Sequence, residues 1–116
     1  MVKFQQIRAY IERIAAEFKP ERILLFGSYA NGAPTEDSDV DLLVVMRHEG
    51  RSVDQAIKIR QKIDAPFPLD LMVRTPEKIK ERLAAQDCFM KEIMDEGSVL
   101  YEAGNRRMDP KSRGRF

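Results

Sequence analysis

The chain has 116 residues, of which 43% are apolar and 34% are charged. This length suits one ordinary domain with a single core, and the composition is that of a soluble globular protein rather than a disordered one. The longest uncharged apolar run, 42–46, is too short for a membrane span or a signal peptide. The single cysteine, Cys88, cannot form an internal disulfide, which fits a reducing cytoplasm.

Charge divides the chain into two parts. Lysine and arginine together number 20 and aspartate and glutamate 19, so the net charge is only +1 and direct nucleic-acid binding is not expected. The segment 104–116 nevertheless carries five basic residues and one acidic residue. We therefore expect a domain over 1–103 and a flexible basic tail over 104–116. The alternative is a basic arm that docks on an acidic partner or on RNA.

Hydrophobic periodicity in the first half predicts one helix and two strands. Apolar residues at helical spacing indicate a helix from about residue 3 to 19, which ends before Pro20. A short buried strand follows over 22–26, and turn residues then lead to a β-branched run, 40–46, that is typical of a central strand.

The second half predicts a helix, a strand, two helices and a last short strand. Ser52 is expected to cap the helix, whose inward positions are Val53, Ala56, Ile57 and Ile63. The third strand covers 69–73, and Thr75 and Asp87 are expected to cap the next two helices. Their inward positions are Ile79, Leu83, Phe89, Met90, Ile93 and Met94.

The connections between the strands predict a mixed sheet. About twenty residues containing a helix join the second and third strands, which is long enough for a parallel pair. The shorter link between the first two strands favours an antiparallel pair. The predicted fold class is α/β (α+β), with a small mixed sheet and flanking helices.

Three carboxylates stand where apolar core residues are expected. Asp39 and Asp41 are two residues apart at the start of the central strand and should share one face, and Asp70 lies within the apolar run 69–73. Carboxylates in apolar surroundings are costly and repel one another unless a cation lies between them. Hard oxygen ligands on a rigid sheet suit Mg²⁺, which keeps other positions for water and phosphate oxygens.

The acidic run 36–41 has two simpler interpretations. Acidic residues near a turn are usually only solvated. A calcium-binding loop starting at Asp37 is excluded, because Leu42 occupies the sixth position, where glycine is needed, and His48 the twelfth, where glutamate is needed.

Gly27 and Ser28 follow the first strand directly and precede a predicted helical turn over 29–31. Glycine lets the backbone approach a ligand closely, and exposed N–H groups together with the Ser28 hydroxyl can hold phosphate oxygens. A simple strand-to-helix turn would need the same residues, so the pair matters only in combination with Asp39, Asp41 and Asp70.

That combination resembles the signature of the nucleotidyltransferase superfamily that includes DNA polymerase beta, and most closely its minimal nucleotidyltransferase (MNT) family. The resemblance is carried by LLFGSYANG at 24–32, SDVDLLV at 38–44 and LDLMV at 69–73. It implies a polymerase beta-like fold and transfer of AMP from ATP to a hydroxyl with two Mg²⁺ ions. Asp39, Asp41 and Asp70 would bind the metals, and Gly27 and Ser28 would hold the triphosphate.

The resemblance also implies a partner. Larger members of the superfamily add domains that bind the acceptor, whereas about forty residues follow Asp70 here. Minimal members are typically antitoxins, and the partner is a HEPN-domain RNase toxin that is inactivated by AMP on a tyrosine. A homo-oligomer is compatible with this interpretation. The alternatives are an antitoxin that acts by binding alone, a nucleotidyltransferase acting on RNA or a small molecule, and a metal-dependent nuclease.

Overall fold

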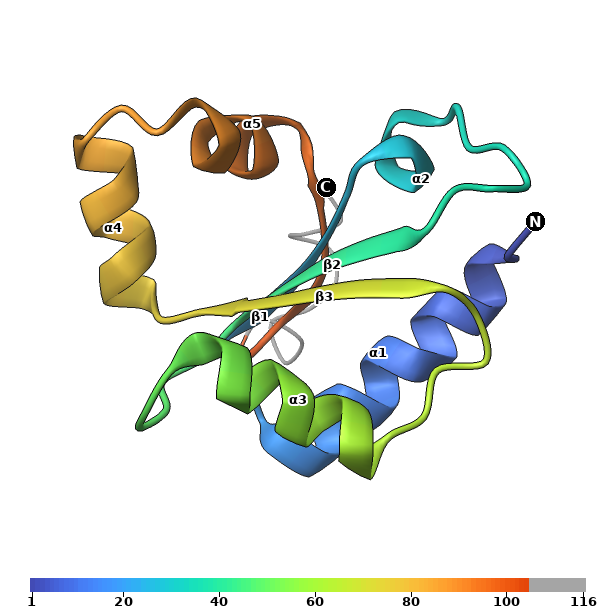
Figure 1. Cartoon of the computed structure of the whole chain (residues 1–116), viewed down its shortest axis with the longest axis horizontal. Coiled ribbons are helices and arrows are strands. Elements are labelled where there is room, and N and C mark those ends of the chain that lie inside the picture. Colours follow the sequence, from blue (N-terminus) through green and yellow to red (C-terminus); the bar gives the residue numbers. More distant parts are fainter. Residues whose placement is uncertain (105–116) are drawn as a thin grey trace.

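The computed structural model describes residues 1–104 (Figure 1). Helices and strands alternate along this part of the chain, except that two helices follow one another before the last strand. In that part the predicted order of elements is confirmed. The elements are α1 (Phe4–Phe18), β1 (Arg22–Phe26), α2 (Ser28–Asn31), β2 (Val40–Val45), α3 (Ser52–Lys62), β3 (Leu69–Arg74), α4 (Pro76–Ala84), α5 (Cys88–Glu96) and β4 (Ser98–Glu102). Apart from Gly104, the predicted basic tail lies outside the described residues. No helix within 1–104 is long and apolar enough to cross a membrane.

The strands form one four-stranded mixed sheet in the order β3-β2-β1-β4. β1 is antiparallel to β2 and β4, whereas β2 and β3 are parallel and are joined by the crossover through α3. Both predicted strand pairings are therefore confirmed. β2 lies inside the sheet and is covered by helices on both faces, which explains why its residues are apolar on both faces.

Helices cover both faces of the sheet (Figure 1). On one face, α1 and α3 pack against β2 side chains such as Leu42 and Val44 in the larger hydrophobic cluster. On the other face, α4 and α5 pack against Leu43 and Val45 in a smaller cluster. Alternation along β2 puts Asp41 on the second face, beyond Leu43. Asp41, one of the predicted site residues, therefore lies on the side covered by α4 and α5.

Local capping starts α4 and α5 as predicted. The Thr75 side chain accepts a hydrogen bond from the Lys78 N–H, and the Asp87 side chain accepts from the Phe89 and Met90 N–H groups. The predicted cap at Ser52 is wrong. Arg51 is the N-cap of α3, and the Ser52 hydroxyl instead lies 3.1 Å from Nε2 of His48.

Several inward assignments on the helices are also wrong. In α3 the buried stripe runs through Ala56 and Ile59, so Val53 and Ile57 are rotated outward and are 54% and 47% exposed. Leu83 and Phe89 are exposed as well, because the smaller cluster is filled by other side chains of α4 and α5. Apolar residues at a 3.6-residue period identify a helix, but they do not show which residues at the edges of the apolar stripe are buried.

The expected burial of Asp70 is wrong for a related reason. β3 is an edge strand, and only Leu71 and Val73 on the α1–α3 face are buried. Asp70 is exposed, and Met72 and Arg74 on the same face are half-buried. Because this face of β3 is only partly covered, a carboxylate is tolerated within an apolar strand.

The corrected orientation of α3 predicts different costs for neighbouring truncations. Ile59→Ala should lower the free energy of unfolding by about 2–5 kcal/mol, since it leaves a cavity in the core. Ile57→Ala should change it by less than about 1 kcal/mol. Urea denaturation of the two variants measures the difference, and equal losses would contradict this orientation of α3.

Candidate functional site

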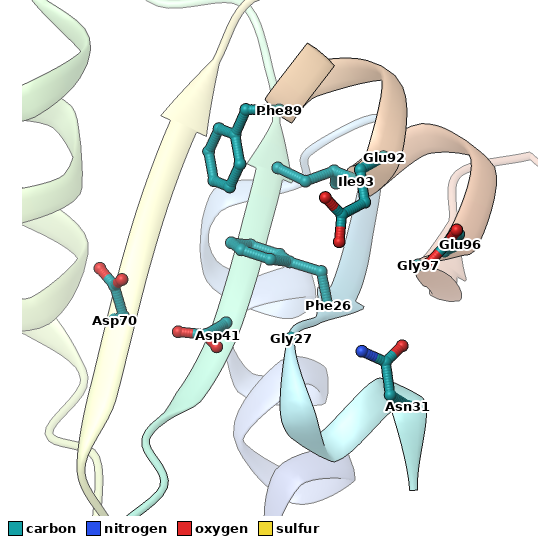
Figure 2. A pocket seen from close by; sticks show the side chains of 10 residues that line it. All are labelled: Phe26, Gly27, Asn31, Asp41, Asp70, Phe89, Glu92, Ile93, Glu96 and Gly97. Atoms are coloured by element: carbon teal, nitrogen blue, oxygen red, sulfur yellow. The ribbon is translucent and has the colours of Figure 1, made fainter. Parts of the chain in front are cut away.

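A cavity of about 290 Å³ opens where β1 ends and β2 begins (Figure 2). Its wall combines the first residues after β1, the carboxylates of two strands and one side of α5. The lining residues are Phe26, Gly27, Asn31, Asp41, Asp70, Phe89, Glu92, Ile93, Glu96 and Gly97. Three of the residues predicted from the sequence, Gly27, Asp41 and Asp70, therefore meet at one cavity.

The strand register places Asp41 beside Asp70. The two residues are Cα partners in the parallel β2–β3 ladder, so their side chains leave the sheet on the same face (Figure 2). On the opposite side, Asp41 is paired with Phe26 of β1. The carboxylate of Asp41 thus lies between an aromatic side chain and a second carboxylate.

This position raises the pKa of Asp41 from 3.8 to about 6. Burial makes the largest contribution, because it disfavours the charged form, and the negative charges of Asp70 and Asp39 add to it. A side-chain hydrogen bond with Asp70 acts in the same direction. The pair carries a repulsion that a bound cation would relieve.

Gly27 makes room for the Asp41 carboxylate. Its backbone has φ 76° and ψ −156°, a conformation that side-chain-bearing residues rarely adopt. A β-carbon built there would also collide with Oδ2 of Asp41 and lie 3.1 Å from its Cγ. Glycine is therefore required by both the backbone turn and the close approach.

Ser28 begins α2 directly after Gly27 but does not line the cavity. The N–H groups of Ala30 and Asn31 bond to the Gly27 carbonyl, so those of Ser28 and Tyr29 have no partner inside the short helix. The Tyr29 side chain points elsewhere, since it packs against the larger hydrophobic cluster and its hydroxyl accepts a hydrogen bond from the Val2 N–H.

Asp39 lies just before β2, is exposed and does not line the cavity. It acts on the site through its charge, which contributes to the raised pKa of Asp41. Within residues 1–104, no three His, Cys, Asp or Glu side chains gather closely enough to hold a metal ion as they stand. The structure thus brings together the pair Asp41 and Asp70, with Asp39 at its margin.

Sequence reasoning missed the contribution of α5. Phe89, Glu92, Ile93 and Glu96 recur at spacings of three and four residues and form one stripe toward the cavity (Figure 2). Apolar periodicity alone assigned Phe89 and Ile93 to the core. The carboxylates interleaved with them are the signal that this helix face also borders a site.

The chemistry of the lining suits a cation. Four of the ten described lining residues are Asp or Glu, and none of the ten is Lys, Arg or His. Phosphate oxygens would meet only negative side chains there unless a divalent ion screened them. The oxygen donors of Asp41 and Asp70, together with the raised pKa of Asp41, fit Mg²⁺.

Comparison with known proteins identifies the family. A model of the nucleotidyltransferase domain matches residues 7–99, which is most of the chain. The chain belongs to this family. The sequence-based prediction of a nucleotidyltransferase is therefore confirmed.

One relative is a Methanocaldococcus jannaschii protein named "Putative protein adenylyltransferase". It is 28% identical to this chain over 99 residues, which cover 82% of this chain and 94% of the relative.

Two solved structures share the fold, which confirms the predicted polymerase beta-like architecture. A "putative nucleotidyltransferase" from Sulfolobus solfataricus superposes with a TM-score of 0.60 at 20% identity, covering 85% of this chain and 79% of the other. A chain of a toxin–antitoxin crystal structure with AMP-PNP superposes with a TM-score of 0.53 at 20% identity, covering 85% and 76%.

The close approach at Gly27 predicts a specific loss of stability. Gly27→Ala should lower the free energy of unfolding more than Gly32→Ala, because Gly32 also has a positive φ of 79° but open space around its β-carbon. In an Asp41→Ala background the cost of Gly27→Ala should fall, since the colliding carboxylate is gone. Urea denaturation of the single and double variants measures this coupling. Additive losses would contradict the contact.

The raised pKa of Asp41 predicts how stability depends on pH. The folded state holds this proton up to about pH 6, whereas an ordinary carboxyl releases it near 3.8. The free energy of unfolding should therefore fall as the pH rises from about 4 to about 7. Asp41→Asn should flatten this part of the profile and be more stable than the wild type at neutral pH. A steeper profile in the variant would contradict the assignment.

The same protonation predicts how Mg²⁺ acts on stability. Added MgCl₂ should raise the melting temperature at neutral pH, because an ion that binds only the folded state stabilises it. The rise should disappear near pH 4, where Asp41 is protonated. It should also disappear in Asp41→Asn, whereas Asp37→Asn, in the exposed turn, serves as the matched control. Differential scanning fluorimetry gives both results.

Proposed function

We propose that this protein is an Mg²⁺-dependent adenylyltransferase that transfers AMP from ATP to a hydroxyl of a protein partner. The observation that carries the proposal is the meeting of Gly27, Asp41 and Asp70 at one cavity in a chain of the nucleotidyltransferase family. The name of the Methanocaldococcus jannaschii relative supports a protein as the acceptor.

In the proposed reaction the acceptor oxygen attacks the α-phosphorus of ATP. A new P–O bond forms to the acceptor, the bond to the β-phosphate oxygen breaks, and pyrophosphate leaves with that electron pair. When bound, two Mg²⁺ ions would neutralise phosphate charge and make the acceptor hydroxyl more acidic. Asp39, Asp41 and Asp70 would hold them, and a carboxylate of the Asp41–Asp70 pair would accept the hydroxyl proton.

Gly27 and Ser28 would hold the triphosphate. The N–H groups of Ser28 and Tyr29 are not used inside α2, so they are free to donate to phosphate oxygens. Asn31 lines the same part of the cavity and adds an uncharged hydrogen-bonding side chain.

The proposed partner is a HEPN-domain RNase toxin, modified on a tyrosine, which makes this protein an antitoxin. The MNT signature in the sequence suggests this partner, and the structural similarity to a chain of a toxin–antitoxin crystal structure with AMP-PNP is consistent with it. The small cavity favours an acceptor that a second protein brings to the site, since nucleotide and acceptor together exceed about 290 Å³.

ATP labelled on the α-phosphate tests the proposal. Purified protein, Mg²⁺ and an extract of its host are mixed, and label on one protein band is expected. Asp39→Asn/Asp41→Asn should reduce the labelling by about 100-fold or more, because the charge that holds the metal is lost. Asp37→Asn, a nearby exposed carboxylate outside the cavity, should label normally.

The other outcomes point to different functions. Label on RNA would favour a terminal nucleotidyltransferase. No label in an extract that contains the cognate toxin would favour an antitoxin that acts by binding alone. Labelling of a protein by the double variant would show that the site is assigned to the wrong residues.

A further inference from the structure

A second and larger hollow lies on the same face of the sheet as the first. It has a volume of about 770 Å³ and extends between the start of α3, β3, α4 and the start of α5. Phe89 lines both hollows and so forms the boundary between them. It is 52% exposed, and its ring meets Phe26 edge-on at 5.9 Å between centroids. We call this second hollow the basic groove.

The charge of the basic groove is opposite to that of the first cavity. Arg51, Arg74, Lys78 and Arg82 line it, and Asp87 is the one acidic residue among its described lining. The lining also includes four apolar side chains, Val53, Met72, Phe89 and Met90. The groove therefore offers both apolar contacts and positive charge to an occupant.

Carboxylates already pair with most of these cations. Arg51 contacts Asp54 at 3.1 Å, Lys78 contacts Glu81 at 3.3 Å, and Arg82 contacts Asp87 at 2.9 Å. Such exposed pairs contribute little to stability and exchange readily with other carboxylates. Arg74 has no carboxylate within ion-pair distance among residues 1–104, and Nη1 of its guanidinium donates to the Val73 carbonyl.

The basic groove is within reach of the reaction site. Asp70 and Arg74 lie on the same face of β3, four residues apart, which is about 13 Å along a strand. An extended segment seated in the groove and passing Phe89 would carry a residue about four positions away to the Asp41–Asp70 pair. A segment bound in the basic groove would therefore place its acceptor residue at the reaction site.

From these observations we propose that the basic groove docks an acidic segment with apolar side chains, belonging to the protein that carries the acceptor hydroxyl. The proposal rests on the proposed function and names the chemistry by which the acceptor is recognised. The acceptor would carry Glu or Asp about four residues from its modified hydroxyl.

The lining favours a protein segment over RNA. Single-stranded nucleic acid binds to rows of aromatic side chains along a strongly positive channel. Phe89 is the single Phe, Tyr or Trp among the described lining residues, so the groove offers no row of such side chains. Aliphatic and methionine side chains suit apolar residues of a peptide.

The probe is a fluorescent random copolymer of Glu and Tyr. A copolymer of Lys and Tyr serves as the control of opposite charge. Fluorescence anisotropy without ATP should show salt-sensitive binding of the acidic copolymer to the wild type. Arg74→Glu/Lys78→Glu should weaken this binding by about tenfold and gain binding of the basic copolymer, a reversal that misfolding cannot produce. Lys80→Glu, on α4 but outside the groove, should change binding less than twofold.

Three outcomes would overturn the proposal. The first is no binding of the acidic copolymer by the wild type. The second is an equal loss in Lys80→Glu. The third is tighter binding of an oligouridine that Arg74→Glu/Lys78→Glu abolishes, which would identify an RNA groove.

The experiment separates this proposal from the proposed function. Binding without ATP does not depend on catalysis, so loss of AMP transfer in Asp41→Asn with intact copolymer binding supports both proposals. Copolymer binding by a wild type that transfers no AMP would overturn the proposed function alone. If the copolymer accepts AMP, Arg74→Glu/Lys78→Glu should raise KM with little change in kcat.

Discussion

The Asp41 carboxylate occupies space that any side chain at residue 27 would fill. The turn at Gly27 brings the end of β1 against the start of β2 so closely that a β-carbon would collide with Asp41. This contact places a carboxylate in partly buried surroundings, which raises its pKa to about 6. The same turn leaves backbone N–H groups at the start of α2 without helical partners. The carboxylate that we propose as a cation ligand and the N–H groups that we propose as phosphate donors thus depend on one backbone feature.

Packing on the opposite face of the sheet keeps Asp41 and Asp70 together despite their repulsion. Leu42 and Val44 of β2 and Leu71 and Val73 of β3 are buried under α1 and α3 in the parallel ladder. A slip of one residue would turn these side chains away from the core, at a cost of several kcal/mol. The register is therefore fixed by apolar burial, and the carboxylates occupy the positions that this register leaves to them.

Features set by local chemistry and by alternation could be predicted from the sequence. They include the strands, the caps at Thr75 and Asp87, the parallel β2–β3 pair and the carboxylates Asp41 and Asp70. What depends on tertiary packing could not be predicted. Ile57 and Phe89 are large apolar residues of the kind found in protein cores, yet both side chains are exposed within residues 1–104.

The site shows the same limit of sequence reasoning. Glu92 and Glu96 reach the cavity only because α5 folds back over the end of β1, far along the chain from Gly27. Ser28, which the resemblance predicts to lie beside the phosphates, does not line the cavity. Neither position follows from residue spacing, because both depend on how α5 and α2 sit over the strand ends.

The size and charge of the two hollows fit a reaction that a second molecule completes. A cavity of about 290 Å³ is at the lower limit for a drug-sized ligand, so ATP would extend beyond it. Its acidic wall would also repel an acidic acceptor that approached unaided. The basic groove beyond Phe89 offsets this repulsion and lies on the same half-covered face of the edge strand β3. Holding the acidic residues of the acceptor about 13 Å from the Asp41–Asp70 pair would keep their charge outside the acidic cavity while the acceptor hydroxyl enters it.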